Sequence, residues 1–212
     1  MNKIWMLLLE GFEVNCRLFI ITLLFALPLG LIITFGTMTK FKPVKWLMKT
    51  FVWIIRGTPL MLQLFVFMYA PGILFDMYWE DRWLPVVLAF VINYAAYFSE
   101  IYRAGIESIS VGQYEAGQVL GLSKIQVFFK VVLFQVIKRI TPPMGNEVIT
   151  LVKDTSLARV VSVSEIMMVA GGKAANGIIW PLFATGIYFL AFNGILTLLL
   201  GYIEKKMNYY KG

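Results

Sequence analysis

Hydrophobic residues are gathered into long runs that short polar segments separate. A helix that crosses a lipid bilayer needs about 20 mostly apolar residues, and five runs of roughly that length can be placed on the chain. We therefore predict transmembrane helices at about 18–37, 51–70, 84–104, 144–163 and 178–201. Composition agrees, because 59% of the 212 residues are hydrophobic and only 15% are charged, against roughly 25% in soluble domains. The predicted fold class is an all-α membrane protein with five transmembrane helices.

The polar segments between these runs predict how the chain is oriented. Cytoplasmic loops carry an excess of lysine and arginine, so we place the basic segments 40–49, 105–142 and 202–212 inside. Their basic residues are Lys40, Lys42, Lys45, Lys49, Lys124, Lys130, Lys138, Arg139, Lys205, Lys206 and Lys211. Segment 71–83 holds three acidic residues and one arginine, so we place it outside. The assignments alternate, with the N-terminus outside and the C-terminus inside, and they explain the net charge of +7.

Polar residues recur at helical spacing within two predicted spans. Glu147 and Asp154 are seven residues apart, so both lie on one helix face, roughly 10 Å apart along the axis. In the preceding span, Asn93, Tyr97 and Glu100 share a face. A charge at bilayer depth costs about 3 kcal/mol or more, so it normally faces a partner or a water-filled cavity. We expect these faces to line a path across the membrane, with candidate residues Asn93, Tyr97, Glu100, Glu147, Thr150, Asp154 and Thr155.

The alternative for these charges is structural. Glu100 could pair with Arg103, and Asp154 with Arg56 or Lys153, since ion pairs also hold membrane helices together. The stretch RGTP at 56–59 interrupts the second run, and its glycine and proline predict a helix break with a packing role.

Residues 112–122 predict a short helix that ends at Gly121, since glycine suits a left-handed cap. Residues 125–141 follow as an amphipathic helix with a basic edge, suited to the membrane interface. A proline pair at 142–143 then precedes the fourth span. Taken alone, this polar stretch could be a mere connector between spans.

Four stretches resemble a known family. EAGQVLGLS, with Glu115, Ala116, Gly117 and Gly121, resembles the EAA loop of ATP-binding cassette (ABC) importer permeases. RGTPLMLQLF at 56–65, SEIYRAGIESI at 99–109 and GNEVITLVKDTSL at 145–157 resemble the branch that carries polar amino acids. The resemblance covers about 11–204. Two departures are Gly117 in place of a second alanine and Phe134 in place of a common proline, and Gly117 is expected to make the loop helix less rigid.

The resemblance implies a type I ABC importer permease fold, with residues 1–212 as one permease domain and 105–142 as its cytoplasmic coupling segment. The function implied is the membrane-spanning permease subunit of an ATP-driven importer for polar amino acids. Glu147 and Asp154 would accept hydrogen bonds from the substrate, and Asn93, Tyr97, Thr150 and Thr155 would donate them. The residues implied to couple to the ATPase are Gln113, Glu115, Ala116, Gly117 and Gly121.

The resemblance also implies partners in a bacterial cell membrane. These are two copies of an ABC ATPase, a second permease as a homodimer or a related chain, an extracytoplasmic solute-binding protein, a polar amino acid and membrane lipid, with no nucleic acid. The chain lacks a Walker A pattern, so ATP and Mg²⁺ are expected on the ATPase and no cofactor here. With no histidine and one cysteine, Cys16, we expect neither a metal site nor an intrachain disulfide.

Three other functions remain open on the residues alone. An ion-coupled secondary amino acid transporter would need no ATPase. A membrane enzyme could use Glu147 and Asp154 as acid and base, although the absence of histidine argues against it. The chain could also be a structural anchor, against which its polar helix faces argue. We expect a transport subunit that is not an enzyme.

Overall fold

The computed structural model describes residues 2–207, and this part of the chain is helical without strands. Lys211 of the basic tail lies outside the described residues. The predicted all-α class is confirmed for the part described. In chain order the elements are α1 (Asn2–Met38), α2 (Lys42–Gly57), α3 (Leu60–Phe75), α4 (Trp83–Glu107), α5 (Val111–Val119), α6 (Lys124–Val127), the π-helix η1 (Phe128–Val132), α7 (Leu133–Asp154), the 3-10 helix η2 (Thr155–Val161), α8 (Ile166–Ala175) and α9 (Trp180–Met207).

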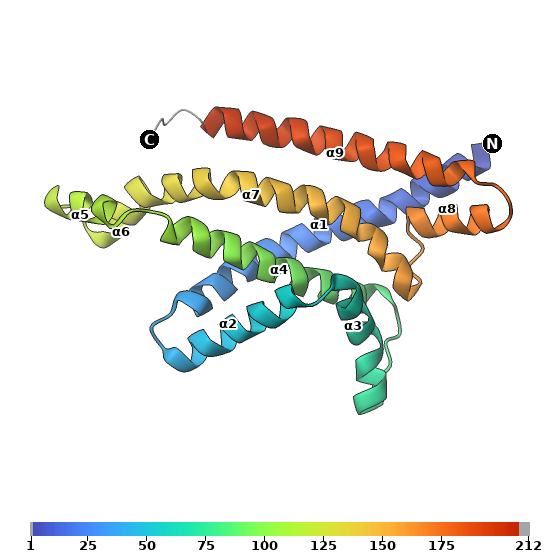
Figure 1. Ribbon diagram of the computed structural model, residues 1–212, viewed down its shortest axis with the longest axis horizontal. Coiled ribbons are helices and arrows are strands. Elements are labelled where there is room, and N and C mark those ends of the chain that lie inside the picture. Colours follow the sequence, from blue (N-terminus) through green and yellow to red (C-terminus); the bar gives the residue numbers. More distant parts are fainter. Residues whose placement is uncertain (1, 208–212) are drawn as a thin grey trace.

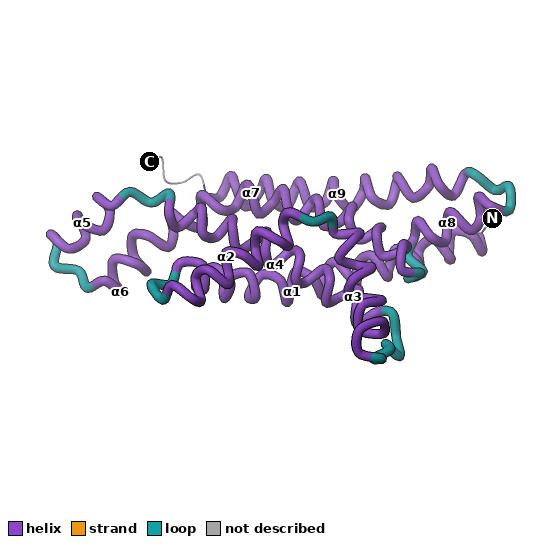
Figure 2. The backbone as a smooth tube through the Cα atoms, turned by 60° about the horizontal axis from the view of Figure 1, so that its bottom comes forward, coloured by secondary structure: helices purple, strands orange, loops and turns teal. Residues whose placement is uncertain are grey.

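The long helices α1, α4, α7 and α9 lie lengthwise in an elongated bundle (Figure 1). α5 and α6 are at one end of this bundle, and α8 and the N-terminus are at the other. Figure 2 shows α3 projecting from the side of the bundle. α1 and α4 pack closely where Gly30 meets α4, since a Cβ there would lie 3.0 Å from the Ala95 carbonyl oxygen. Phe90, Phe98 and Leu151 are fully buried in the hydrophobic core.

Three helices are long and apolar enough to cross a membrane, namely those at Lys3–Met38, Trp83–Glu107 and Trp180–Met207. They cover the first, third and fifth predicted runs. The second run is not one interrupted helix, because α2 and α3 meet at a bend of 108° and count as a fourth span only when taken together. The sharp bend follows from Thr58 and Pro59, whose extended backbone separates the two helices.

The α2–α3 turn is held by one buried side chain. The Gln63 amide nitrogen donates to the carbonyl of Ile55 (2.8 Å) and to the carbonyl and hydroxyl oxygens of Thr58 (3.2 and 2.9 Å). Its amide oxygen accepts from Asn93 Nδ2 of α4 at 3.0 Å. The break predicted at 56–59 is therefore confirmed, and its geometry is fixed by contacts from α3 and α4.

The fourth predicted run begins and ends elsewhere. The amphipathic segment and that run are joined in α7, which continues through Pro142 and Pro143 and ends at Asp154. The backbone then changes from α-helix to the 3-10 helix η2, so 155–161 is 3-10 helix where α-helix was expected. Prolines are tolerated inside membrane helices when their surroundings satisfy the freed backbone groups. The proline pair therefore does not mark the start of a helix here.

The polar stretch at the α5–α6 end forms a compact turn. α5 ends near Gly121, which has φ 72°, so the predicted left-handed glycine is confirmed. Ser123 and Gln126 form a capping box that starts α6, with each side chain bonded to the other's backbone nitrogen. Gly117 is buried, and a Cβ there would lie 2.5 Å from Val127 Cγ2 of α6. A small residue at this position lets the two short helices touch.

Candidate functional site: a charged pocket between α2, α4 and α7

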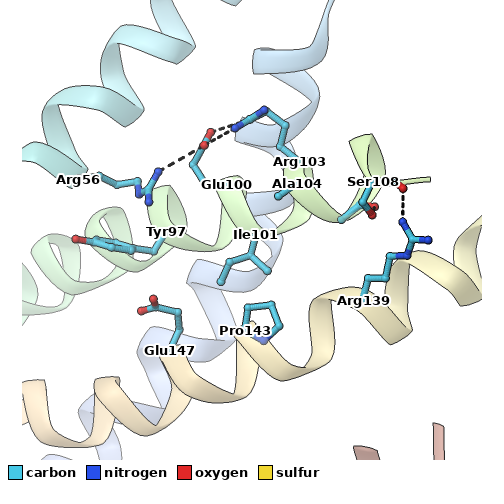
Figure 3. A pocket seen from close by; sticks show the side chains of 11 residues that line it. Arg56, Tyr97, Glu100, Ile101, Arg103, Ala104, Ser108, Arg139, Pro143 and Glu147 are labelled. Carbon is cyan, nitrogen blue, oxygen red and sulfur yellow. Dashed lines mark hydrogen bonds and ion pairs between the residues drawn. The ribbon is translucent and has the colours of Figure 1, made fainter. Parts of the chain in front are cut away.

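A pocket of about 420 Å³ lies between α2, α4 and the middle of α7 (Figure 3). Its volume is within the roughly 300–1,000 Å³ usual for small-molecule sites. Its polar groups come mainly from three helices. Arg56 lies in the last turn of α2, and α4 and α7 contribute residues from successive turns. The residues that line it are Arg56, Tyr97, Glu100, Ile101, Arg103, Ala104, Gly105, Ser108, Arg139, Pro143 and Glu147.

Glu100 is the centre of an ion-pair network in this pocket. Arg103 donates two hydrogen bonds to it, from Nε to Oε1 at 3.0 Å and from Nη2 to Oε2 at 2.6 Å. Arg103 also reaches Glu107 at 2.5 Å, and Arg56 Nη1 lies 3.5 Å from Glu100 Oε2. The structural alternative for Glu100 is thus confirmed, since it pairs with Arg103. Arg56 pairs with Glu100, an ion pair that the sequence interpretation did not include.

Tyr97 and Glu147 complete the polar wall. The Arg56 guanidinium carbon lies 5.2 Å from the centre of the Tyr97 ring, within range of a cation–π contact. Glu147 is half-buried and borders the same pocket from α7. Among residues 2–207, no lysine or arginine forms an ion pair with Glu147 within 4.0 Å. The pocket therefore combines one paired carboxylate, one carboxylate without such a partner, and three guanidinium groups.

Asp154 lies farther along the same helix. The hydroxyl of Tyr94, a buried residue of α4, donates to Asp154 Oδ2 at 2.7 Å. Within the described chain, Asp154 forms no ion pair with either Arg56 or Lys153. Glu147 and Asp154 both fall within α7, as the seven-residue spacing requires. Asp154 bonds to α4 through Tyr94, whereas Glu147 faces α4 across the pocket.

Three other predicted residues have hydrogen-bond partners outside the pocket. Asn93 is buried and donates to Gln63 at the α2–α3 turn. Thr150 is bonded to its own helix through the Asn146 carbonyl at 3.0 Å. Thr155 is buried against α1, where it accepts from Asn15 Nδ2 at 2.9 Å. Of the seven candidates, the pocket brings together Tyr97, Glu100 and Glu147.

Asn15 organises a second buried polar cluster at the opposite end from α5. It bonds to Thr155, donates to Glu165 Oε2 at 3.2 Å and accepts from the Ile166 backbone nitrogen at 3.1 Å. Glu165 is fully buried and accepts from the Met167 and Met168 nitrogens at the start of α8. This cluster fixes α1 to the end of α7 and to α8.

Sequence reasoning missed several residues of these sites. Arg56 was considered as a partner for Asp154 and as part of the helix break at 56–59, Arg103 as a partner for Glu100, and Arg139 as a basic residue of the cytoplasmic segment. None of the three was placed in a pocket. Tyr94 lies one helical turn before Tyr97, so the same facing argument applied one turn earlier would have found it. Gln63 carried no signal, because its role depends on a bend that the hydrophobic pattern does not show.

The coupling segment presents its polar residues outward. Gln113, Glu115 and Ala116 are exposed on α5, while Gly117 faces α6. Two apolar side chains next to them are also exposed, Val119 at 88% and Leu120 at 77%. Such an arrangement suits contact with a protein partner.

Two hydrogen bonds tie this end of the molecule to α7. Gln135 Nε2 donates to Gln113 Oε1 at 3.1 Å, and the Arg139 guanidinium donates to the Ser108 carbonyl. Both donors lie on α7 after the π-helical turn. A displacement of α5 would therefore reach the helix that carries Glu147.

The family described as "Binding-protein-dependent transport system inner membrane component" matches residues 26–209. The chain belongs to this family. It is a multi-pass membrane protein and a permease component of an ABC importer. The L-cystine transport system permease protein TcyB of Bacillus subtilis is 34% identical over 213 residues, covering 99% of this chain and 90% of the relative. The arginine transport system permease protein ArtQ of the same organism is 32% identical over 202 residues, covering 94% and 92%.

A solved structure agrees with this permease assignment. An amino acid ABC transporter crystallised with histidines has a chain with TM-score 0.86 and 28% identity, covering 97% of this chain and 96% of that one. The likeness confirms the permease fold. Neither the family nor these relatives support an ion-coupled secondary transporter.

Proposed function

We propose that this permease imports polar amino acids, with its path between α4 and α7 and its drive from a separate ATPase. The observation that carries the proposal is the charged pocket. It holds both carboxylate and guanidinium groups, so it can bind both the ammonium and the carboxylate of an amino acid. The named substrates of the relatives, L-cystine and arginine, are of this chemical class.

The proposed topology has five spans. α1, the α2–α3 pair, α4 and α9 supply four, and α7 with η2 supplies the fifth. The N-terminus and α8 are then outside and α5 and α6 are inside, in keeping with the basic residues near α5 and the acidic loop before α4. These two groups of elements lie at opposite ends of the bundle (Figure 1).

The substrate would pass two polar levels on its way in. Asp154, oriented by Tyr94, forms the outer level, and Glu147, Tyr97 and Arg56 form the inner one. Asn93 and Thr155 support the walls through their buried bonds, and Thr150 lies on α7 between the two carboxylates. No bond of the substrate breaks, so these residues only bind and release it.

The coupling segment is proposed to dock on the ATPase. Glu115 is exposed and can meet a basic surface, while Val119 and Leu120 can be buried against apolar groups. Gly121 sets the turn that follows α5. Gly117 contributes by fixing α5 to α6, so its effect on docking is indirect.

The complete transporter is proposed to hold two ATPase copies, two permeases and a solute-binding protein. Only 11% of the most apolar stretch of α9 is buried, so this helix has a face for lipid or a second permease. Its exposed apolar side chains include Phe183, Leu190 and Leu198. ATP and Mg²⁺ would be bound by the ATPase alone.

Charge reversal at Glu115 tests the proposal in liposomes that hold the permease, its ATPase and the binding protein. We expect ATP-dependent uptake of an amino acid in the unmodified complex. Glu115→Lys should reduce uptake at least tenfold while the chain stays inserted, because a basic docking surface would repel the new charge. ATP hydrolysis per molecule imported is the measurement.

Glu10→Lys is the matched control, since it makes the same charge change at an exposed site on α1. Uptake should be normal in this variant. Normal uptake in Glu115→Lys would overturn the docking assignment. A complex that takes up no amino acid would overturn the proposed substrate class.

A further inference from the structure

Two charged groups in the pocket have binding capacity left over. They are the Arg56 guanidinium at the end of α2 and the Glu147 carboxylate on α7, which border the same pocket from different helices. Figure 3 shows both of them beside the ring of Tyr97. One is a cation and the other an anion, which is the pair that an α-amino acid zwitterion requires.

Arg56 is only lightly engaged. Among residues 2–207 it forms one ion pair, with Glu100, and that pair is long at 3.5 Å. Both oxygens of Glu100 already accept shorter bonds from Arg103. The Arg56 side chain is 42% exposed, so its guanidinium can still be reached from the pocket. A guanidinium has five N–H donors in a planar fork that matches a carboxylate, and most of these donors remain for a ligand.

Glu147 is the complementary group. It is half-buried on the pocket side of α7, and within 2–207 it takes part in none of the ion pairs. A carboxylate in a membrane protein normally has a partner or faces a watery cavity. Here it faces the cavity. An ammonium group would supply the missing positive charge and three hydrogen-bond donors.

We propose that Arg56 and Glu147 form the recognition site for the backbone of the substrate. The α-carboxylate binds the Arg56 guanidinium, the α-ammonium binds Glu147, and Tyr97 lies against the ligand. The side chain then points into the rest of the pocket, towards Ser108 and Arg139. The site selects free α-amino acids as a class, independently of the side chain they carry.

This inference rests on the proposed function and is more specific than it. It assigns each charged end of the ligand to one residue. Once the assigned residue has been replaced, removing the matching charged end of the ligand should therefore cost no further affinity. Replacing a merely structural residue would instead lower the affinity for every ligand alike. The experiment uses that difference.

The test measures binding to the complete permease–ATPase complex in lipid nanodiscs, without the solute-binding protein, so that its selectivity plays no part. An uptake screen of the protein amino acids and L-cystine first selects the probe. If it is L-arginine, the competitors are agmatine, which lacks the α-carboxylate, and δ-guanidinovaleric acid, which lacks the α-amine. For L-cystine they are cystamine and dithiodipropionic acid, and for any other probe the corresponding amine and acid.

We expect the unmodified complex to prefer the probe over each analogue by about 10- to 100-fold, as expected for a lost bond to a charged group. In Arg56→Gln the preference over the decarboxylated analogue should fall to about one, while the preference over the deaminated analogue persists. Glu147→Gln should show the reverse pattern.

Arg17→Gln is the matched control, because it removes the same charge from an exposed arginine of α1 that does not line the pocket. Both preferences should persist in this variant. Equal weakening of the probe and both analogues by Arg56→Gln would overturn the site, as would an unmodified complex that binds all three alike. A screen in which no amino acid is taken up would instead overturn the proposed function.

Discussion

Gly117 shows how one missing side chain shapes the coupling segment. The family pattern has an alanine at this position, and the glycine was expected to make α5 less rigid. The contact with Val127 gives the glycine a packing role instead, because a methyl group would lie 2.5 Å from a valine methyl. The cost in helix propensity, up to about 1 kcal/mol, is thus set against close packing of α5 on α6.

Gly117→Ala should therefore weaken the segment, since overpacking typically costs about 1–3 kcal/mol. We expect faster amide hydrogen exchange in 111–127, measured by mass spectrometry on the complex. Gly112→Ala is the control, because its added methyl group would meet nothing within 4 Å apart from its chain neighbours and its own helix backbone, and helix propensity should slow exchange there. Val127→Ala combined with Gly117→Ala should restore protection. Slower exchange in Gly117→Ala alone would contradict this packing role.

The candidate residues show what periodicity can and cannot predict. Glu147 and Asp154 were found because spacing within one helix fixes a shared face. Arg56 was missed as part of the pocket because its place depends on how α2 packs against α4. Asn93 was found as a polar residue in a span, but its partner Gln63 is a tertiary neighbour that no local pattern reveals.

At the scale of elements, the hydrophobic runs predicted where the helices lie along the chain better than they predicted the directions in which the helices run. In the run at 51–70 the stretch RGTP predicted a break in the helix, but nothing in its composition gives the bend of 108° between the two halves. The proline pair at 142–143 suggested a boundary, yet α7 continues through it. Both outcomes depend on which backbone groups neighbouring elements satisfy, and a single sequence does not contain that information.

Gln63 is the side chain on which the α2–α3 turn depends. Gln63→Leu would remove the bonds to Ile55 and Thr58 and leave the Asn93 amide without its acceptor. An unpaired buried polar group costs about 1–3 kcal/mol, so we expect the melting temperature of the purified complex to fall by several degrees. Ser164→Leu, at an exposed site before α8 and away from the coupling segment, should leave it unchanged. Equal melting temperatures for the two variants would show that the turn is held by other contacts.

The whole molecule has two distinct ends, and its proposed orientation can be measured directly. Replacing Cys16 by serine gives a chain without cysteine. Single cysteines can then be introduced at exposed Ser164 near α8 or at exposed Gln118 on α5. In intact cells, a membrane-impermeant maleimide should label Ser164→Cys and should reach Gln118→Cys only after the membrane is opened. The opposite labelling pattern would show that the topology is inverted. Labelling of both cysteines in intact cells would exclude the proposed topology.

α7 is one uninterrupted rod of 22 residues, from the bonds that hold the coupling segment to the carboxylate of Asp154. At about 1.5 Å per residue it is roughly 33 Å long, so a tilt of about 10° around one end swings the other by about 6 Å. That stroke exceeds the length of any hydrogen bond. A small rotation of α7 relative to α4, about the end that bonds to α5, is therefore enough to separate Asp154 from Tyr94, without unfolding a single helical turn.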